Sequence, residues 1–452
     1  MKDNSRGSIK ELLPIAFPIF FSQSVDVLMV FTDRYFLAGL GKEELAASFT
    51  GGILYYLICN LCFGILGQIA PIVAQYRGAG EMETGVRTVH QGFILALVLS
   101  PLLYLIGYNS SPYILDFFNH AEKLHENELK YFRILSLTIM IASIRLVFAN
   151  FFIGIGKTRI VTLGALSAVI INIPVTYILI FGKFGFPKLG IEGAAIGTVL
   201  SSIFPVIILG INFFKKKNRE EFKTSTSFKY NKELTFKLVK YGFPSGIELL
   251  LNVSGFFFFS MVMYSYSSEV AAATSIVLNW DMVCFIPLIG IGQAVGSLIG
   301  KYLGEEEKEI ALKSAWSALK IGAMYSIIIT IVYFSFTEHL VSIFSTPEDQ
   351  GRKEVYLYAN MMLKISCIYF FFDAAYSILG GILRGAGDTF WVMVVSNSIM
   401  WATATTVYLT KNYFQFTPIH SWLSLTLMVF SLCIIFMIRF LQKKWLDRLM
   451  IR

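Results

Sequence analysis

Long apolar segments separated by short polar connections run through the whole chain. Twelve of them are about 20 residues long, the length that an α-helix needs to cross the hydrocarbon core of a membrane. They are centred near residues 25, 58, 100, 142, 170, 202, 251, 285, 325, 370, 400 and 431. The short connections leave no room for a soluble catalytic domain. The pattern therefore predicts an all-α polytopic membrane protein with twelve transmembrane helices.

The two halves of the chain align with each other at a nearly constant spacing. Phe17-Pro18 falls on Phe243-Pro244, 226 residues further on, and the Gly-x-Gly-x-Thr motif at 154–158 meets the one at 385–389. Matches that keep their order and spacing indicate an internal duplication. Each half has six spans, so both halves enter the membrane from the same side, and the repeats are parallel.

Two six-helix lobes are expected from this repeat: an N-lobe at 1–214 and a C-lobe at 241–452, joined by a linker at 215–240. The linker contains nine Lys or Arg residues, and most of the other basic residues fall into loops on the same side. By the positive-inside rule, this side and both termini are cytoplasmic. The net charge of +8 is therefore a signal for orientation in the bilayer rather than for nucleic-acid binding. The amino-acid composition also indicates a membrane protein, since 55% of the residues are hydrophobic and only 15% are charged.

One carboxylate lies in the middle of the tenth apolar segment. Tyr369, Asp373 and Ser377 recur every four residues and share one helical face. An ionised side chain at the centre of a membrane helix costs about 2.5–3.5 kcal/mol on insertion scales, so such acids mark ion or substrate pathways. The structural alternative is an acid neutralised by a partner such as Arg145 or Lys364.

Polar residues in the N-terminal half suggest a second site. Asp26 and Asp33 are seven residues apart in the first helix, which places them on one face. A pair of acids there suits the handling of protons or cations. Asn172 and Thr176, one turn apart in the fifth helix, offer neutral oxygens to a cation or hydrogen bonds to a neighbouring helix.

Three further polar residues lie in the seventh and eighth helices. Glu248 and Asn252 are one turn apart in the seventh, and Glu248 is the second candidate acid after Asp373. Asp281 in the eighth helix is an intramembrane acid with no partner that the sequence can name. These acids are scattered over several helices, with no nucleophile–base pair and no His motif that binds zinc, so an intramembrane enzyme is only a remote alternative. The chain is expected not to be an enzyme and to need no cofactor.

Four motifs resemble the multidrug and toxic compound extrusion (MATE) transporters, more their NorM-like branch than the DinF-like one. They are FTDRYFLAGLGKEELAA at 31–47, PIVAQYRGAGE at 71–81, NIPVTYILIFGKFG at 172–185 and FFDAAYSILGGILRGAGDT at 371–389. The resemblance covers nearly the whole chain. It implies twelve helices in two lobes around a central cavity, and export of amphipathic, often cationic compounds in exchange for Na⁺ or H⁺.

The resemblance also implies roles for single residues. Asp373 matches the tenth-helix acid of the family's cation site and Tyr369 its aromatic companion. Asp33 and Asn172 match N-lobe residues that couple protons or substrate. The seventh-helix acid of the family falls on Asn252 here, which departs from the pattern. Glu248, one turn earlier, is its candidate replacement, and Asp373 with Glu248 is the expected Na⁺ site.

The sequence is thus interpreted as a monomeric antiporter of the plasma membrane, coupled to Na⁺ or H⁺, that exports small amphipathic cations. An alternative keeps the fold but exports an anionic metabolite or a lipid-linked precursor. Such a cargo requires basic residues inside the bundle, where Arg145 is the main candidate.

Overall fold

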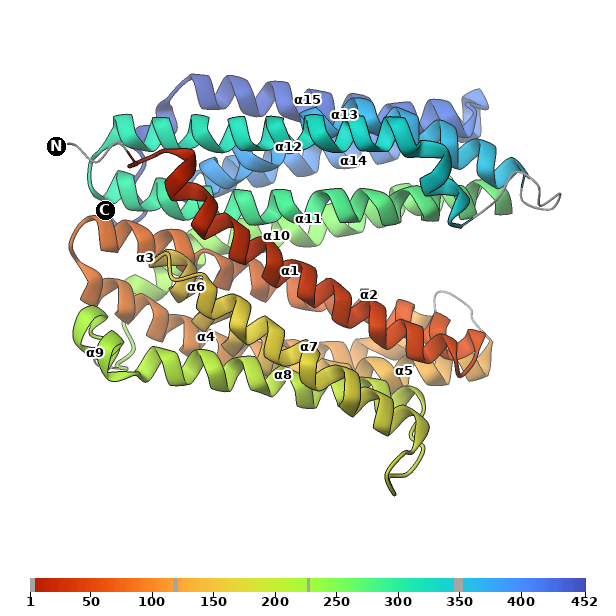
Figure 1. Cartoon of the computed structure of the whole chain (residues 1–452), viewed down its shortest axis with the longest axis horizontal. Helices are drawn as coiled ribbons and strands as arrows, with labels where there is room; N and C mark the ends of the chain where they lie inside the picture. The colour runs from red at the N-terminus through yellow and green to blue at the C-terminus, as the bar shows by residue number, and fades with distance from the viewer. Residues whose placement is uncertain (1–4, 117–120, 226–227, 345–352) are drawn as a thin grey trace. The chain divides into compact units, whose positions relative to one another are not determined.

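The computed structural model describes residues 5–116, 121–225, 228–344 and 353–452, and within these ranges the chain is helical, without a strand (Figure 1). The elements are α1 (Ile9–Ala38), α2 (Lys42–Gly67), α3 (Ile69–Gly78), α4 (Met82–Asp116), α5 (Glu122–Ser136), α6 (Thr138–Gly154), α7 (Arg159–Phe181), α8 (Ile191–Phe214), α9 (Lys216–Phe222), α10 (Lys232–Tyr264), α11 (Ser268–Gly304), α12 (Lys308–Ser342), α13 (Lys353–Ala386), α14 (Thr389–Phe414), α15 (Pro418–Leu441) and the 3₁₀ helix η1 (Lys444–Asp447).

Twelve helical segments in the described ranges are long and apolar enough to cross a membrane. The second segment consists of α2 and α3, which are separated at Gln68, and the fourth consists of α5 and α6, which are separated at Leu137. The remaining ten are single helices. The predicted all-α membrane fold with twelve spans is confirmed, and the chain is a multi-pass membrane protein.

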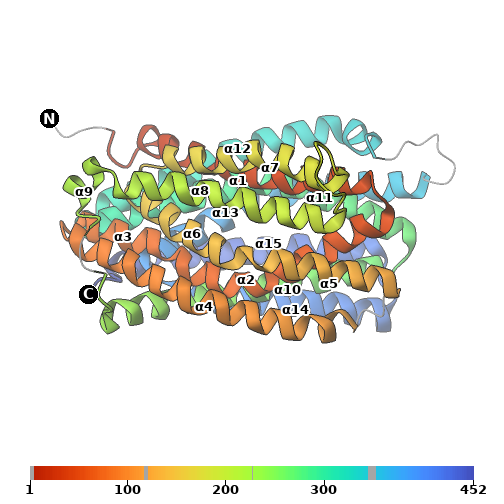
Figure 2. The ribbon, with the colours of Figure 1, turned by 90° about the horizontal axis from the view of Figure 1, so that it is seen from below.

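The described residues form two compact units. The N-unit contains Phe21–Leu250 with Gly304–Glu306 and Met450–Arg452, and the C-unit contains the chain up to Phe20, Leu251–Leu303 and Glu307–Leu449. Within the N-unit, α7 lies beside α8 and α2 beside α5 (Figure 2). Within the C-unit, α13 contacts both α12 and α15. The expected lobe boundaries stay a prediction.

The first part of α10 belongs to the N-unit because small residues let it approach α2 closely. A Cβ atom added to Gly64 would collide with the backbone of Gly246. Next to this contact, Gln68 Nε2 donates a hydrogen bond of 3.0 Å to Ser245 Oγ. Small residues and polar side chains are the usual means of helix association in a membrane, where no hydrophobic force drives it.

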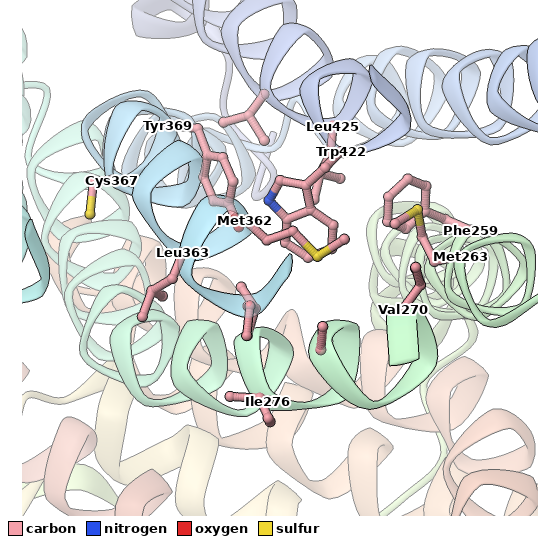
Figure 3. Close-up of a cluster of buried hydrophobic side chains, with 14 of the residues drawn as sticks. Phe259, Met263, Val270, Ile276, Met362, Leu363, Cys367, Tyr369, Trp422 and Leu425 are labelled. Atoms are coloured by element: carbon pink, nitrogen blue, oxygen red, sulfur yellow. The ribbon is translucent and has the colours of Figure 1, made fainter. Parts of the chain in front are cut away.

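The core of the C-unit holds α13 in place. Trp422 of α15 is fully buried, and it packs beside Met362 of α13 and Phe259 of α10 (Figure 3). Tyr369 of α13 lies at the edge of the same cluster and is only 5% exposed. The large apolar side chains thus fix the helix that carries Asp373.

Candidate functional site

Asp373 of α13 is half-buried among the helices of the C-unit. Its carboxylate has neither a hydrogen bond nor an ion pair with any residue that the structure describes. Lys364, a possible neutralising partner, has an exposed side chain. Arg145, the other possible partner, pairs with a different acid in the N-unit. Asp373 is therefore an intramembrane acid whose charge no described side chain neutralises.

Tyr369 connects α13 to an acid on α11. Its hydroxyl donates a hydrogen bond to Asp281 Oδ2, and it accepts one of 3.0 Å from Ser366 Oγ. Asp281 Oδ1 is shielded from solvent and has no hydrogen-bond donor among the described residues. Asp281 also lies close enough to Asp373 for an electrostatic interaction. The sequence placed Tyr369 beside Asp373 but gave no partner for Asp281.

The two candidate residues of α10 fall into different units. Glu248 belongs to the N-unit and is 5% exposed. Asn252 belongs to the C-unit, where its Nδ2 donates a hydrogen bond of 3.3 Å to Asn397 Oδ1 on α14. The expected pairing of Glu248 with Asp373 stays a prediction.

Asp33 is the centre of a polar group within the N-unit. Thr198 Oγ1 of α8 donates a hydrogen bond of 2.8 Å to Asp33 Oδ2, and Asn172 and Thr176 lie within reach of the same carboxylate. Asn172 Nδ2 donates to Thr176 Oγ1 over 3.1 Å and to Ser201 Oγ over 3.4 Å. Asp33 Oδ1 and Asn172 Oδ1 are both buried without a donor in the described part of the chain. The structure therefore brings together three of the predicted N-lobe residues.

This group consists of oxygen atoms, which are the ligands that hard cations prefer. Among the residues described, no cluster of three or more His, Cys, Asp or Glu side chains has a metal-binding arrangement. A cation at Asp33 would therefore rely on neutral oxygens besides one carboxylate. Thr198 and Ser201 of α8 were not predicted. The only signal for them is a pair of hydroxyl residues close together in an apolar helix.

Asp26, the fourth predicted N-lobe residue, is separately paired. Arg145 Nη1 of α6 lies 3.3 Å from Asp26 Oδ2, and about 30% of each side chain is exposed. The pair neutralises both charges within the N-unit. Of the two N-lobe acids, Asp26 is thus the one whose charge is matched by a described basic side chain.

Twelve spans with two sets of intramembrane polar residues are typical of a membrane transporter. The MatE family model matches residues 18–178 and 244–409, which is more than half of the chain, so the chain belongs to the MatE family. The two matched segments begin 226 residues apart, the spacing of the duplication in the sequence. The predicted MATE membership is confirmed.

Relatives found by sequence similarity agree with this assignment along nearly the whole chain. The probable multidrug resistance protein NorM of Thermotoga maritima is 26% identical over 441 residues, which is 97% of this chain and 93% of that protein. The protein of the same name from Bacillus subtilis is 25% identical over 425 residues, 93% of each chain. These relatives place the chain among transporters rather than enzymes and support the NorM-like branch.

Solved structures show the same fold. The outward-facing structure of a multidrug resistance MATE family transporter of the MOP superfamily has a TM-score of 0.88 and 19% identity, covering 98% of this chain and 97% of that one. A MOP superfamily transporter from Pyrococcus furiosus, described as having a binding pocket of reverse polarity, also has a TM-score of 0.88, at 18% identity over 98% of each chain.

Proposed function

We propose that this protein is an antiporter that exports small amphipathic organic cations across the plasma membrane in exchange for Na⁺ or H⁺. The observation that carries the proposal is Asp373, an acid in the middle of a membrane-spanning helix with no basic partner among the described residues. Such an acid is stabilised when a cation occupies it. The names of the relatives, multidrug resistance proteins, support efflux of several compounds as the activity. We further propose that the protein is monomeric, that both of its termini lie in the cytoplasm, and that it needs no cofactor besides the coupling ion.

In the proposed cycle, the coupling ion and the organic cation compete for the same negative charge. On the outer side, Na⁺ or H⁺ neutralises Asp373, so that a bound organic cation loses its counter-ion and leaves. Access then switches to the cytoplasmic side, where the low ion concentration removes the coupling ion. The membrane potential contributes about 2.3 kcal/mol per charge per 100 mV to this exchange, in addition to the concentration gradient.

Two positions are proposed for the coupling ion. The first is the C-unit acid Asp373, with Glu248 as the second Na⁺ ligand expected from the sequence. The second is the oxygen-rich group around Asp33, where Asp33 and Asn172 each have a buried oxygen without a donor. The Asp33 carboxylate would take up a proton, or both oxygens together would bind a cation. Asn252 is proposed to help position the first site.

An anionic metabolite or lipid-linked precursor is the less favoured cargo. Binding of an anion inside the bundle requires a basic side chain with an available charge. Arg145, the main candidate, is paired with Asp26 within the N-unit. An anion would have to break this ion pair, and breaking a partly buried pair is costly.

Transport by purified protein in liposomes tests the proposal. Ethidium movement is followed under an imposed Na⁺ gradient and then under a pH gradient, for the wild type, Asp373→Asn and the control Glu354→Gln, which removes an exposed carboxylate from the first turn of α13. We expect one of the gradients to drive ethidium in the wild type and the control, and Asp373→Asn to abolish this movement. Gradient-driven transport that survives in Asp373→Asn would move the coupling site to Asp33 or Glu248.

A further inference from the structure

Helices α11 and α13 approach each other along a line of glycines within the C-unit. A Cβ atom added to Gly381 would collide with the backbone of Gly292, and one added to Gly296 would lie 2.9 Å from the carbonyl oxygen of Gly381. One turn further on, Gly385 meets the backbone of Gly296 in the same way. The two helices therefore run in the same direction in close contact, with Gly292 opposite Gly381 and Gly296 opposite Gly385, an offset of 89 positions.

This register places Asp281 opposite residue 370 of α13. The hydrogen bond from Tyr369 agrees with it, and Asp373 follows one turn later on the same face as Tyr369. The two carboxylates are thus neighbours because the glycine contacts fix the helices in this register. Large side chains along this line would separate the helices and prevent the approach.

A purely structural role does not account for Asp281. The hydrogen bond from Tyr369 satisfies Oδ2, but Oδ1 is buried without a donor in the described parts of the chain. An unsatisfied buried polar group costs about 1–3 kcal/mol, and more when it is charged. The neighbouring carboxylate of Asp373 adds like-charge repulsion. No Lys, Arg or His among the residues described forms an ion pair with either acid.

A cation from solution would remove both costs at once. It would give Asp281 Oδ1 a partner and would neutralise the repulsion between the two acids. Asn252, the candidate residue of α10 within the C-unit, is uncharged, and its amide donates a hydrogen bond to Asn397. Within the C-unit, Asp281 of α11 is the acid that lies beside Asp373.

We propose that Asp281 and Asp373 together bind the coupling cation, with the Tyr369 hydroxyl holding Asp281 in position. This inference rests on the proposed function, and it names α11 as the source of the second acid. Ser366 orients the Tyr369 hydroxyl through its own hydrogen bond. The ligand is a monovalent cation, either Na⁺ or a proton, and the experiment distinguishes the two.

Equilibrium binding of ²²Na⁺ to the purified protein is measured separately from transport, for the wild type, Asp281→Asn, Asp373→Asn and Glu269→Gln. The last variant removes a partly exposed acid from the first turn of the same helix α11. We expect both Asp variants to weaken Na⁺ binding at least tenfold and Glu269→Gln to leave it unchanged. If the ion is a proton, wild-type protein binds no Na⁺, and both Asp variants lose ethidium movement driven by the pH gradient.

A measurement on the wild-type protein covers the case that Asp281→Asn does not fold. Dicyclohexylcarbodiimide labels carboxyl groups in apolar surroundings, and mass spectrometry identifies the labelled peptides. We expect Asp281 and Asp373 to be labelled. If the coupling ion is Na⁺, added Na⁺ should protect both acids. If it is a proton, labelling of both acids should fall together as the pH rises, because the reagent attacks the protonated carboxyl group. Protection of Asp373 alone would overturn the inference.

These experiments distinguish a failure of the inferred Asp281–Asp373 site from a failure of the proposed function. If ion-driven transport is lost in Asp373→Asn but Asp281→Asn keeps wild-type ion affinity and coupling, the inference is wrong and the proposed function stands. If the wild type moves ethidium under neither gradient, the proposed function is wrong. Na⁺ binding that depends on both acids would then still support the site.

Discussion

Two facing glycines on α11 and α13 differ in their tolerance of a methyl group. A Cβ atom on Gly381 would lie only 2.7 Å from the Cα atom and 2.8 Å from the carbonyl carbon of Gly292. A Cβ atom on Gly292 would have the carbonyl oxygen of Ser377 as its nearest neighbour, at 3.4 Å, which is an ordinary van der Waals contact. We therefore predict that Gly381→Ala destabilises the protein and that Gly292→Ala does not.

The difference in stability between Gly381→Ala and Gly292→Ala follows from these contacts. The atoms that meet the added methyl group at Gly381 belong to the backbone, so no side chain can rotate away. The carbonyl oxygen of Gly292 lies closer to the added methyl group than these two carbon atoms, so the helices have to separate by more than about 0.7 Å to restore ordinary contact. Such overpacking costs about 1–3 kcal/mol. Alanine favours a helix over glycine by about 1 kcal/mol in both variants. The predicted difference in stability between the two variants is therefore about 1–3 kcal/mol, with Gly381→Ala the less stable.

Both variants are purified in one detergent and heated, and the fraction that remains monodisperse is followed by size-exclusion chromatography. We expect a lower midpoint temperature for Gly381→Ala than for the wild type, and a midpoint at or above that of the wild type for Gly292→Ala. The separation should also lengthen the hydrogen bond between Tyr369 and Asp281, so Gly381→Ala should bind the coupling ion more weakly. Equal midpoints for the two variants would refute the deduced register of α11 and α13.

Two further substitutions test the packing of the C-unit. Trp422→Ala removes a fully buried ring from the core in Figure 3 and should lower the free energy of unfolding in detergent by about 3–5 kcal/mol. Trp316→Ala, at a side chain that is 41% exposed, should lower it much less. Similar losses in the two variants would contradict the assignment of Trp422 to the core. Asp388 is 1% exposed, accepts a hydrogen bond of 2.8 Å from Arg439 Nε and forms an ion pair of 2.8 Å with Arg448, so Asp388→Asn should destabilise by about 3–5 kcal/mol. Asp447→Asn breaks an exposed ion pair with Lys308 and should have little effect; a comparable loss would show that burial does not decide the outcome.

The membrane spans follow from the sequence because apolar length is a local property. The breaks at Gln68 and Leu137 within two of the spans were not predicted. Neither residue is a proline or a glycine, and the break at Gln68 coincides with the hydrogen bond to Ser245 on α10. A contact between helices that are far apart in the sequence leaves no local signal.

The sequence shows spacing within one helix but not contacts between distant helices, and this explains which site residues could be predicted from it. Tyr369 and Asp373 are one turn apart on one helix, so helical periodicity places them together. The hydrogen bond from Tyr369 to Asp281 joins residues 88 positions apart, and it depends on the glycine contacts between α11 and α13. The bond from Thr198 to Asp33 spans 165 positions and likewise needs the packed structure.

Obligatory exchange is the central claim, and the counter-movement of ion and substrate tests it most directly. Proteoliposomes are loaded with ethidium and placed in a medium with equal Na⁺ and H⁺ concentrations on both sides, so that only the ethidium gradient is present. The account predicts that ethidium leaving the vesicles drives ²²Na⁺ or protons inward, and that Asp373→Asn abolishes this ion movement. Ethidium that equilibrates through the wild-type protein with no movement of either ion would contradict antiport.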